Sequence, residues 1–260
     1  MKANYYNWMP KGMIAGFGAA CAGLAVGAVL LWLLDSGTAA TVLAVVLTIG
    51  AVGCGLWTAC CKYAFNQFSY EGKRQLSRQI IEGIAEHITL PENGKGLDVG
   101  CGSGALTIAC AKRNPQGTML GVDVWGPEYA HFSPETCERN AKAEGVSNTA
   151  FEKGNAIQLP FEDESFDAVT SNYVYHNIVG KNKQVLLLET LRVLKKGGTF
   201  AIHDLISRTR YGDMQAFRTQ LLAMGYEQVE LIDTTNGLFM SKSEARRTML
   251  TGSTLLVGKK

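Results

Sequence analysis

Two long stretches without a charged side chain occupy the first quarter of the chain. Residues 13–34 form a run of 22 uncharged positions, and residues 38–61 form a second run of 24 after a short polar turn. A helix spans a bilayer with about 20 predominantly apolar residues. The pattern predicts a transmembrane helical hairpin. A buried core hairpin is an alternative, but two consecutive runs exceed what a small core holds. A cleaved signal peptide is a second alternative, but the first run is too long for one.

The remaining residues alternate between short apolar runs and amphipathic segments. Helices are predicted at 68–88, 106–113, 134–144, 183–194 and 213–224. Strands are predicted at 96–100, 118–124, 149–153, 166–171, 199–205, 228–233 and 254–257. Such alternation predicts an α/β fold with a mostly parallel seven-stranded sheet and helices on both faces. The last two strands are close in sequence, which favours an antiparallel pair at one edge. The predicted parts are the hairpin (1–61), a linker with its helix (62–93) and the α/β domain (94–260).

Charge divides the chain in the same way. The sequence is 47% hydrophobic and 18% charged, yet only Lys2, Lys11 and Asp35 of its 48 charged residues precede residue 62. The net charge of +2 lacks the basic footprint of a nucleic-acid binder, so no nucleic-acid partner is expected. Basic residues flank both runs on their outer sides. The positive-inside bias therefore predicts a two-span protein of the cell membrane, with both termini and the α/β domain in the cytoplasm.

Small residues and cysteines add two expectations about the hairpin. The pairs Gly23/Gly27 and Gly55/Ala59 would allow close helix approach, within the hairpin or in a homodimer through the glycine-rich spans. Four of the seven cysteines lie in or at the end of the runs, and the other three lack metal-ligand spacing. No metal site is therefore expected.

The sharpest motif is a glycine-rich loop between a predicted strand and a predicted helix. Asp98 is followed by glycine at positions 100, 102 and 104, and Asp123 ends the next strand. Glycines let a ligand approach the backbone, and a carboxylate after the second strand can bind ribose hydroxyls. A dinucleotide fits the glycine spacing. Asp98 would repel a pyrophosphate, however, and favours a ligand with an ammonium group, such as S-adenosylmethionine.

Three segments together resemble a known family. Residues 97–106, 154–169 and 188–200 resemble the class I S-adenosylmethionine-dependent methyltransferases, especially the small-molecule branch related to the ubiquinone and menaquinone C-methyltransferases. The likeness covers residues 94–205. It implies a Rossmann-like doubly wound sheet, S-adenosyl-L-methionine as cofactor and methyl transfer as the reaction.

The resemblance also implies a set of cofactor-binding residues. The glycine loop would pass under the methionine end of the cofactor with Asp98 near its amino group, Asp123 would hold the ribose, and Asn172 would lie near the methyl. Val124 and Trp125 would flank the adenine, and Asn155 replaces the aspartate that the family usually places near the adenine amino group. The full set is Asp98, Gly100, Cys101, Gly102, Gly104, Asp123, Val124, Trp125, Asn155, Ala156 and Asn172.

Methyl transfer needs an aligned acceptor and, for some acceptors, a base. His176 follows the fourth strand and is a candidate general base, with packing at the next helix as its alternative. Tyr173 is a second candidate catalytic residue. His203 and Tyr70 are candidate substrate contacts, Tyr70 as part of a lid or as a helix-start residue. Residues 234–247 are expected to shape the substrate pocket or touch the membrane surface.

These observations predict a membrane-anchored methyltransferase whose acceptor is a small, amphipathic or lipid-phase molecule. One alternative is a soluble cytosolic acceptor, with the hairpin serving only as an anchor. Another is a non-catalytic cofactor-binding membrane scaffold. A nucleotide-sugar or nicotinamide enzyme with the same loop is a further alternative. The sequence leaves the acceptor atom and the oligomeric state open.

Overall fold

A computed structural model describes residues 2–34, 37–126 and 132–260 of the chain. The predicted turn residues 35–36 lie outside the described residues. The chain divides into two compact units. The α/β unit contains the residues up to Tyr6 together with Arg78–Ala245 and Leu250–Lys260, and the helical unit contains Asn7–Ser77 and Arg246–Met249.

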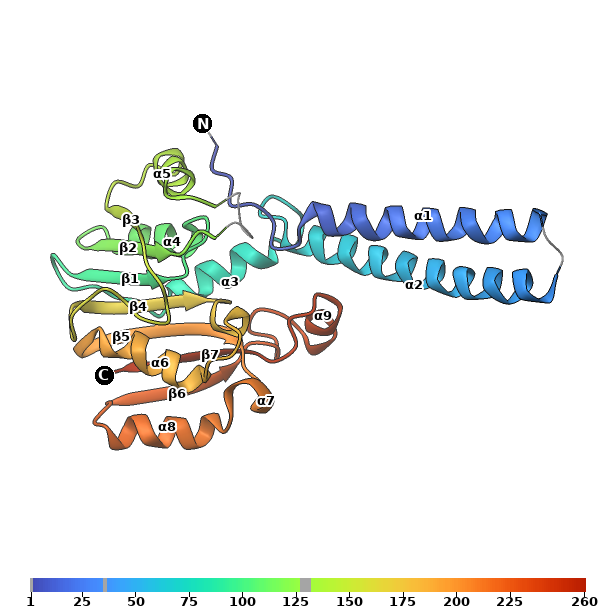
Figure 1. The fold of residues 1–260 in the computed structure, drawn as a ribbon. Helices are drawn as coiled ribbons and strands as arrows, with labels where there is room; N and C mark the ends of the chain where they lie inside the picture. Colours follow the sequence, from blue (N-terminus) through green and yellow to red (C-terminus); the bar gives the residue numbers. More distant parts are fainter. Residues whose placement is uncertain (1, 35–36, 127–131) are drawn as a thin grey trace. The chain divides into compact units, whose positions relative to one another are not determined.

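The α/β unit is built on a sheet that has seven strands within the described residues (Figure 1). Their order is β3-β2-β1-β4-β5-β7-β6. The strands are β1 (Lys95–Val99), β2 (Thr118–Asp123), β3 (Thr149–Lys153), β4 (Phe166–Asn172), β5 (Leu194–Leu205), β6 (Gln228–Asp233) and β7 (Ser253–Lys259). The chain runs outward from β1 to β3 and then returns to β4 on the other side of β1. This reversal is the topological switch point at which doubly wound sheets bind ligands.

Strand direction brings the carboxyl ends of six strands to one edge of the sheet. The pairs from β3 to β5 are parallel, whereas β7 is antiparallel to both β5 and β6. The expected antiparallel pair is confirmed, with β7 inside the sheet and β6 at its edge. The predicted α/β class with a mostly parallel seven-stranded sheet is also confirmed. β1 lies in the interior of the sheet order, and four of its five residues are buried.

Helices precede or connect the strands, and several of them pack on the sheet. They are α3 (Leu76–Ala85), α4 (Ala105–Arg113), α5 (Pro134–Ala143), α6 (Lys183–Arg192), α7 (Arg208–Tyr211), α8 (Met214–Ala223), α9 (Lys242–Arg247) and the 3-10 turn η2 (Tyr175–Asn177). α4 packs on β1 to β4, α6 on β5 and α8 on β6. Ser133, Asn182 and Asp213 accept first-turn N–H groups and so fix the starts of α5, α6 and α8.

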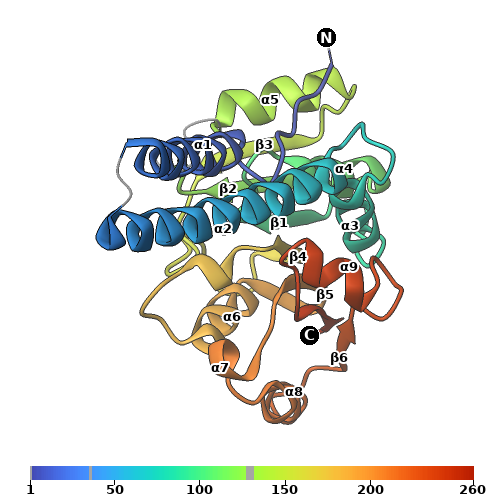
Figure 2. The same ribbon diagram turned by 90° about the vertical axis from the view of Figure 1, so that its right-hand side faces the viewer.

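The helical unit contains two long apolar helices that lie side by side (Figure 2). These are α1 (Lys11–Leu34) and α2 (Thr38–Phe68), and each contains an 18-residue window with mean hydropathy 2.2. By length and composition, both are able to cross a membrane. Only 6% of the window in α1 and 17% of that in α2 are buried.

The small residues of these helices are used where the helices meet. A Cβ added at Gly27 would come within 3.3 Å of Leu47, and one at Gly55 within 3.3 Å of the Cys21 sulfur. Gly23, the other member of the first predicted pair, has open space at that position. One member of each predicted pair therefore serves contact between α1 and α2.

The prediction of one helix over residues 68–88 is wrong. α2 continues to Phe68, and α3 begins only at Leu76. The turn between them includes Gln75, whose φ of 48° is incompatible with an α-helix. The apolar residues follow the 3.6-residue spacing of a helix only from Leu76 onward. The short helices α7 and α9 were not predicted, because four and six residues give too little periodicity to detect.

Candidate functional site

The glycine loop joins β1 to α4 at the switch point. Gly100, Gly102 and Gly104 have φ values of 74°, 55° and 80°, which is the left-handed region that glycine enters without steric cost. Close packing adds a second requirement at Gly100, because an added Cβ would lie 2.2 Å from Cγ2 of Val174. The loop therefore packs directly on the segment that follows β4.

Asp98 lies buried behind this loop. One of its carboxylate oxygens accepts from the Thr107 hydroxyl (2.6 Å) and the other from the Thr170 hydroxyl (2.9 Å). Burial raises the pKa of Asp98 to about 6, although these two hydrogen bonds act against the rise. Asp98 is thus a charged support under the loop at neutral pH. Its predicted place beside the cofactor's amino group stays a prediction.

Asp123, at the end of β2, fixes the loop from the other side. One carboxylate oxygen accepts from the backbone N–H of Gly102 and the other from that of Trp125, each at 2.9 Å. A carboxylate offers about four acceptor positions. Asp123 therefore retains acceptor capacity for two ribose hydroxyls.

The residues predicted around the adenine lie at the ends of β2 and β3. Val124 is exposed, and Trp125 donates from its indole nitrogen to the Gly102 carbonyl at 2.9 Å. Asn155 is exposed, and its amide oxygen accepts from the backbone N–H of Ile157. Ala156 is buried in the apolar core. The structure thus brings Trp125 to the glycine loop, and Asn155 keeps one lone pair for an adenine amino group.

Cys101 contributes backbone and volume to the loop. Its thiol is buried, and burial raises its pKa well above the ordinary value. It therefore stays protonated and has no role as a thiolate nucleophile.

These residues fit S-adenosylmethionine, the cofactor implied by the sequence resemblance. Three left-handed glycines leave the loop without side chains at these positions, Asp123 has acceptor capacity for a diol, and Val124 offers an apolar surface. Asp98 and Asp123 are also favourable neighbours for a cofactor that carries a sulfonium and an ammonium group. The cofactor-binding roles of the individual residues stay predictions.

His176, in η2 after β4, and Asp204, near the end of β5, form a hydrogen-bonded pair. Nδ1 of His176 lies 2.5 Å from a carboxylate oxygen of Asp204, and the backbone N–H of His176 donates to the other oxygen at 3.1 Å. Asp204 is fully buried, whereas 18% of the His176 side chain is exposed. Burial alone would raise the pKa of Asp204, but hydrogen bonding and charge attraction from His176 hold it below its ordinary value. Sequence reasoning missed Asp204 as the partner of His176.

His203 occupies a different environment from its neighbour Asp204. It is fully buried, and its ring nitrogens lie 2.9 Å from the Asn172 amide oxygen and 3.0 Å from the Thr234 hydroxyl. Burial lowers the pKa of His203 to about 3, so the imidazole is neutral. This arrangement holds Asn172 at the end of β4. The predicted substrate contact of His203 stays a prediction.

Tyr173 lies between these two histidines. Its ring centroid is 4.7 Å from that of His203 and 6.2 Å from that of His176, and its hydroxyl bonds to Ser253 at 2.6 Å. Burial raises the pKa of Tyr173 above its ordinary value, so the phenol is neutral. Its φ of 56° is uncommon for an aromatic residue and is typical of strained positions at functional sites. The predicted catalytic role of Tyr173 stays a prediction.

The remaining predicted regions, residues 234–247 and Tyr70, belong to different parts of the chain. The connection from β6 to β7 reaches the site, because Thr234 bonds His203 and the Phe239 ring lies 5.6 Å from the His203 ring. Tyr70 belongs to the helical unit, in the turn after α2. Its predicted lid role stays a prediction.

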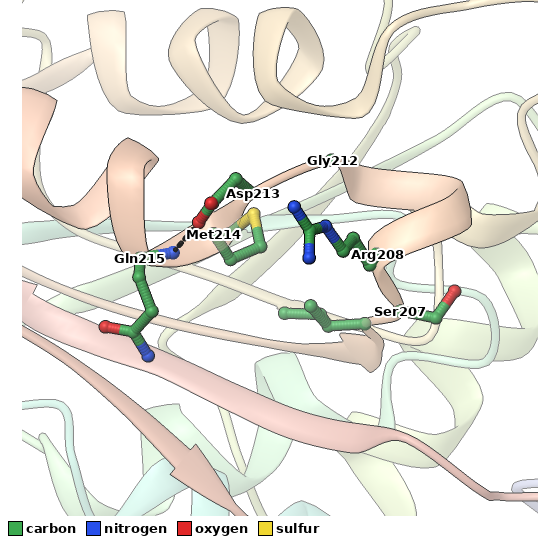
Figure 3. Close-up of a pocket in the computed structure, with 7 residues that line it drawn as sticks. Ser207, Arg208, Gly212, Asp213, Met214 and Gln215 are labelled. Carbon is green, nitrogen blue, oxygen red and sulfur yellow. Dashed lines mark hydrogen bonds between the residues drawn. The ribbon is translucent and has the colours of Figure 1, made fainter.

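A shallow hollow of about 380 Å³ lies just after the end of β5 (Figure 3). It is lined by Ile206, Ser207, Arg208, Gly212, Asp213, Met214 and Gln215. The Asp213 carboxylate accepts from the backbone N–H of Gln215 and caps α8, so it is committed to local structure. The lining includes no residue of the glycine loop, and the hollow is therefore separate from the cofactor site.

Comparisons with known proteins show the family of the chain. The family model described as a methyltransferase domain matches residues 97–202. The demethylmenaquinone methyltransferase of Staphylococcus aureus is 31% identical over 194 residues, which is 70% of this chain and 75% of that protein. The demethylmenaquinone methyltransferase of Geobacillus stearothermophilus is 29% identical over 172 residues, 62% and 70% of the two chains. A sterol 24-C-methyltransferase of Gibberella zeae is 31% identical over 146 residues, 56% of this chain and 36% of that protein.

Solved structures share the fold at lower identity. The [4+2]-cyclase SpnF aligns with a TM-score of 0.54 and 19% identity, covering 72% of this chain and 82% of that one. The geranyl diphosphate C-methyltransferase of Streptomyces coelicolor A3(2) aligns with a TM-score of 0.53 and 16% identity, covering 75% and 83%. A cyclase and a methyltransferase thus share this fold, so the reaction has to be argued from family membership and from the site.

Proposed function

The chain belongs to the class I S-adenosylmethionine-dependent methyltransferases, and from this membership we propose that it is membrane-anchored and methylates a small lipid-phase acceptor. It is an enzyme, and S-adenosylmethionine is its cofactor. The observation that carries the membrane part of the proposal is the apolar surface of α1 and α2. Large side chains such as Leu34, Ile49 and Leu56 are mostly exposed on these helices.

Exposure of an apolar surface of this extent to water is unfavourable. Contiguous exposed apolar patches beyond a few hundred Å² indicate contact with a partner or a membrane. Two helices of 24 and 31 residues also exceed the length that a bilayer requires. Lipid is therefore the covering that we propose for both helices.

The N-terminal segment supports a hairpin with both ends on one side. Residues up to Tyr6 belong to the α/β unit, and so does the chain from Arg78 onward. The two helices therefore leave the α/β unit and return to it, which requires an even number of crossings. Together with the flanking lysines and arginines, this supports a cytoplasmic α/β unit.

The names of the relatives support the acceptor class. Two of the relatives described above are named for demethylmenaquinone and one for a sterol. Both are lipid-soluble molecules. Anchoring an enzyme in the phase that holds its acceptor raises the effective concentration of that acceptor. We infer that the acceptor of this chain is likewise drawn from the bilayer.

The His176–Asp204 pair supplies the acid–base part of the proposal. The bound cofactor provides a methyl group activated on sulfur, which is transferred in line to an acceptor atom. With Nδ1–H donated to Asp204, Nε2 of His176 is the atom able to accept a proton from the acceptor. Asp204 then stabilises the imidazolium that forms. The pair favours acceptors that lose a proton on methylation.

Transfer of a labelled methyl group tests the proposed function. The full-length protein, in phosphatidylcholine vesicles, is incubated with labelled S-adenosylmethionine and either a total lipid extract or an aqueous extract of the producing cells. The proposal predicts label in the lipid products. Label confined to aqueous products would instead identify a soluble acceptor, and cofactor binding without any labelled product would identify a scaffold. Each of these results contradicts the proposal.

A further inference from the structure

The first residues of the chain are held on the α/β unit. Residues up to Tyr6 belong to that unit, whereas Asn7 and α1 belong to the helical unit. Both views show this segment running beside α5 (Figure 1, Figure 2). The bonds that hold this segment converge on the glycine loop.

Asn140, a buried side chain of α5, makes three of these bonds. Its amide oxygen accepts from the backbone N–H of Asn4 at 2.8 Å, and its amide nitrogen donates to the Asn4 carbonyl at 3.0 Å. The same nitrogen donates to the carbonyl of Ser103 at 3.0 Å. One side chain therefore joins the N-terminal segment to the carbonyl of Ser103, which lies between Gly102 and Gly104.

Two further contacts join the segment to the loop. The Ser103 hydroxyl donates to the Tyr5 carbonyl at 3.1 Å, with both residues buried. The Tyr6 ring meets Phe132 edge-on with centroids 5.9 Å apart. Phe132 in turn lies 3.7 Å from the position of a Cβ added at Gly102. The segment thus reaches the loop at Ser103 and, through Phe132, at Gly102.

The composition of the loop makes such contacts important for binding. Glycine loses more conformational freedom on ordering than any other residue, and this loop has three glycines in five positions. If the loop is ordered only on binding, the entropy cost lowers cofactor affinity. If folding of the protein has already ordered the loop, cofactor binding does not bear this entropy cost.

We propose that Asn140 and the backbone of residues 4 and 5 form a clamp that holds the glycine loop in its cofactor-binding conformation. Asn140 is then a positioning residue for S-adenosylmethionine, and the segment before α1 is part of the cofactor site. Only residues 7–10 separate Tyr6 from α1, so the clamp is attached directly to the anchor. Because linkage is reciprocal, the bound cofactor stabilises the clamp.

Asn140→Ala, made in the full-length protein, tests this proposal. Loss of the bonds to Asn4 and Ser103 is expected to weaken S-adenosylhomocysteine binding about tenfold in calorimetry. The KM for S-adenosylmethionine rises by a similar factor, whereas kcat is unchanged. This split separates loop positioning from a general loss of folded enzyme.

Asn148→Ala is the matched control. Asn148 also donates from one amide nitrogen to several carbonyls, those of Ala111, Asn114 and Gly117, but at the far end of α4. It is expected to lower the melting temperature and leave affinity for S-adenosylhomocysteine within about twofold. Equal affinities of the Asn140 and Asn148 variants would overturn the proposal.

Hydrogen exchange of the unmodified protein gives a readout that needs no variant. The Asn4 N–H donates to Asn140, so its exchange reports opening of the clamp. Saturating S-adenosylhomocysteine is expected to slow exchange in residues 3–6 several-fold. An unchanged exchange rate in these residues would also overturn the proposal.

Discussion

The buried carboxylate of Asp98 illustrates a conflict between stability and function at a single residue. Burial raises its pKa from 3.8 to about 6, a difference of roughly 3 kcal/mol between the two protonation states. The folded protein therefore binds this proton more tightly than the unfolded chain does. The stability from this group is fully present below pH 3.8 and is lost as pH rises through 6.

Asp98→Asn is expected to remove this pH dependence. At pH 8 the variant should melt several degrees above the wild type, because it buries no charge. The difference should shrink as pH falls toward 4, where wild-type Asp98 is protonated in the fold. Thermal melts of both proteins between pH 4 and pH 8 test this. A difference that is constant across this range would contradict the assigned pKa.

Asp123 allows a direct test of the ribose assignment. Asp123→Ala removes a charged acceptor and is expected to weaken S-adenosylhomocysteine binding about a hundredfold. Asp233→Ala is a matched control, because Asp233 also ends a strand and accepts from the backbone N–H two residues later. Calorimetry on both variants separates the two cases. Intact affinity in the Asp123 variant would remove Asp123 from the cofactor site.

The His176–Asp204 pair predicts non-additive kinetics. His176→Ala and Asp204→Asn should each lower kcat about a hundredfold, with affinity for S-adenosylhomocysteine nearly unchanged. The double variant should be about as active as either single variant, because both substitutions disable one unit. His87→Ala, at an exposed histidine after α3, is the control. Multiplicative losses in the double variant would show that the two residues act separately.

The sequence could not reveal that His176 pairs with Asp204. His203 and Asp204 are adjacent in the chain. Neighbouring residues of a strand, however, point to opposite faces of the sheet. His203 therefore meets Asn172 and Thr234, whereas Asp204 meets His176, which is 28 residues away in sequence. Residue types were predictable here, but pairing required the register between β4 and β5.

The loop between β1 and α4 shows the same limit for an element. Its glycines were predicted from their spacing, but Val174 as the neighbour of Gly100 was not. Gly100 has a left-handed φ of 74°, and Val174 already fills the space that an added methyl group would need. Both demands come from folding of the loop against the end of β4, a contact that sequence spacing does not show.

Gly100→Ala should therefore cost far more than a change of backbone preference alone. We expect loss of detectable cofactor binding and a destabilisation of several kcal/mol from the clash with Val174. Gly145→Ala is the control, because Gly145 has a φ of 70° and open space around an added Cβ. That change should cost only about 1 kcal/mol. Equal destabilisation in denaturant titrations would contradict the packing account.

For the whole molecule, the sequence predicted the two apolar helices and the sheet but not the contacts of residues 4–6 with the α/β unit. The apolar runs and the alternating pattern are local signals, and both were sufficient to predict elements. The bonds between Asn4 and Asn140 join residues 136 positions apart, and no local pattern encodes them. The same holds for the division into units, which separates Tyr6 from Asn7.

The hairpin account predicts that both termini lie on the same side of the membrane. Affinity tags before Lys2 and after Lys260 should be cleaved together in inside-out vesicles of the producing cells and protected together in right-side-out vesicles. Immunoblots against each tag after protease treatment test this. A tag that is protected in inside-out vesicles and cleaved in right-side-out vesicles, while the other tag shows the reverse, would contradict the even number of crossings.

The central claim is that this methyltransferase finds its acceptor in the lipid phase, and surface dilution tests it most directly. A fixed amount of the cellular lipid extract is mixed with increasing inert phosphatidylcholine in vesicles that carry the full-length protein. Labelled methyl transfer is then measured at saturating S-adenosylmethionine. If the acceptor is taken from the bilayer, the rate falls as its mole fraction in the vesicle falls. A rate that is independent of the added phosphatidylcholine would contradict the claim.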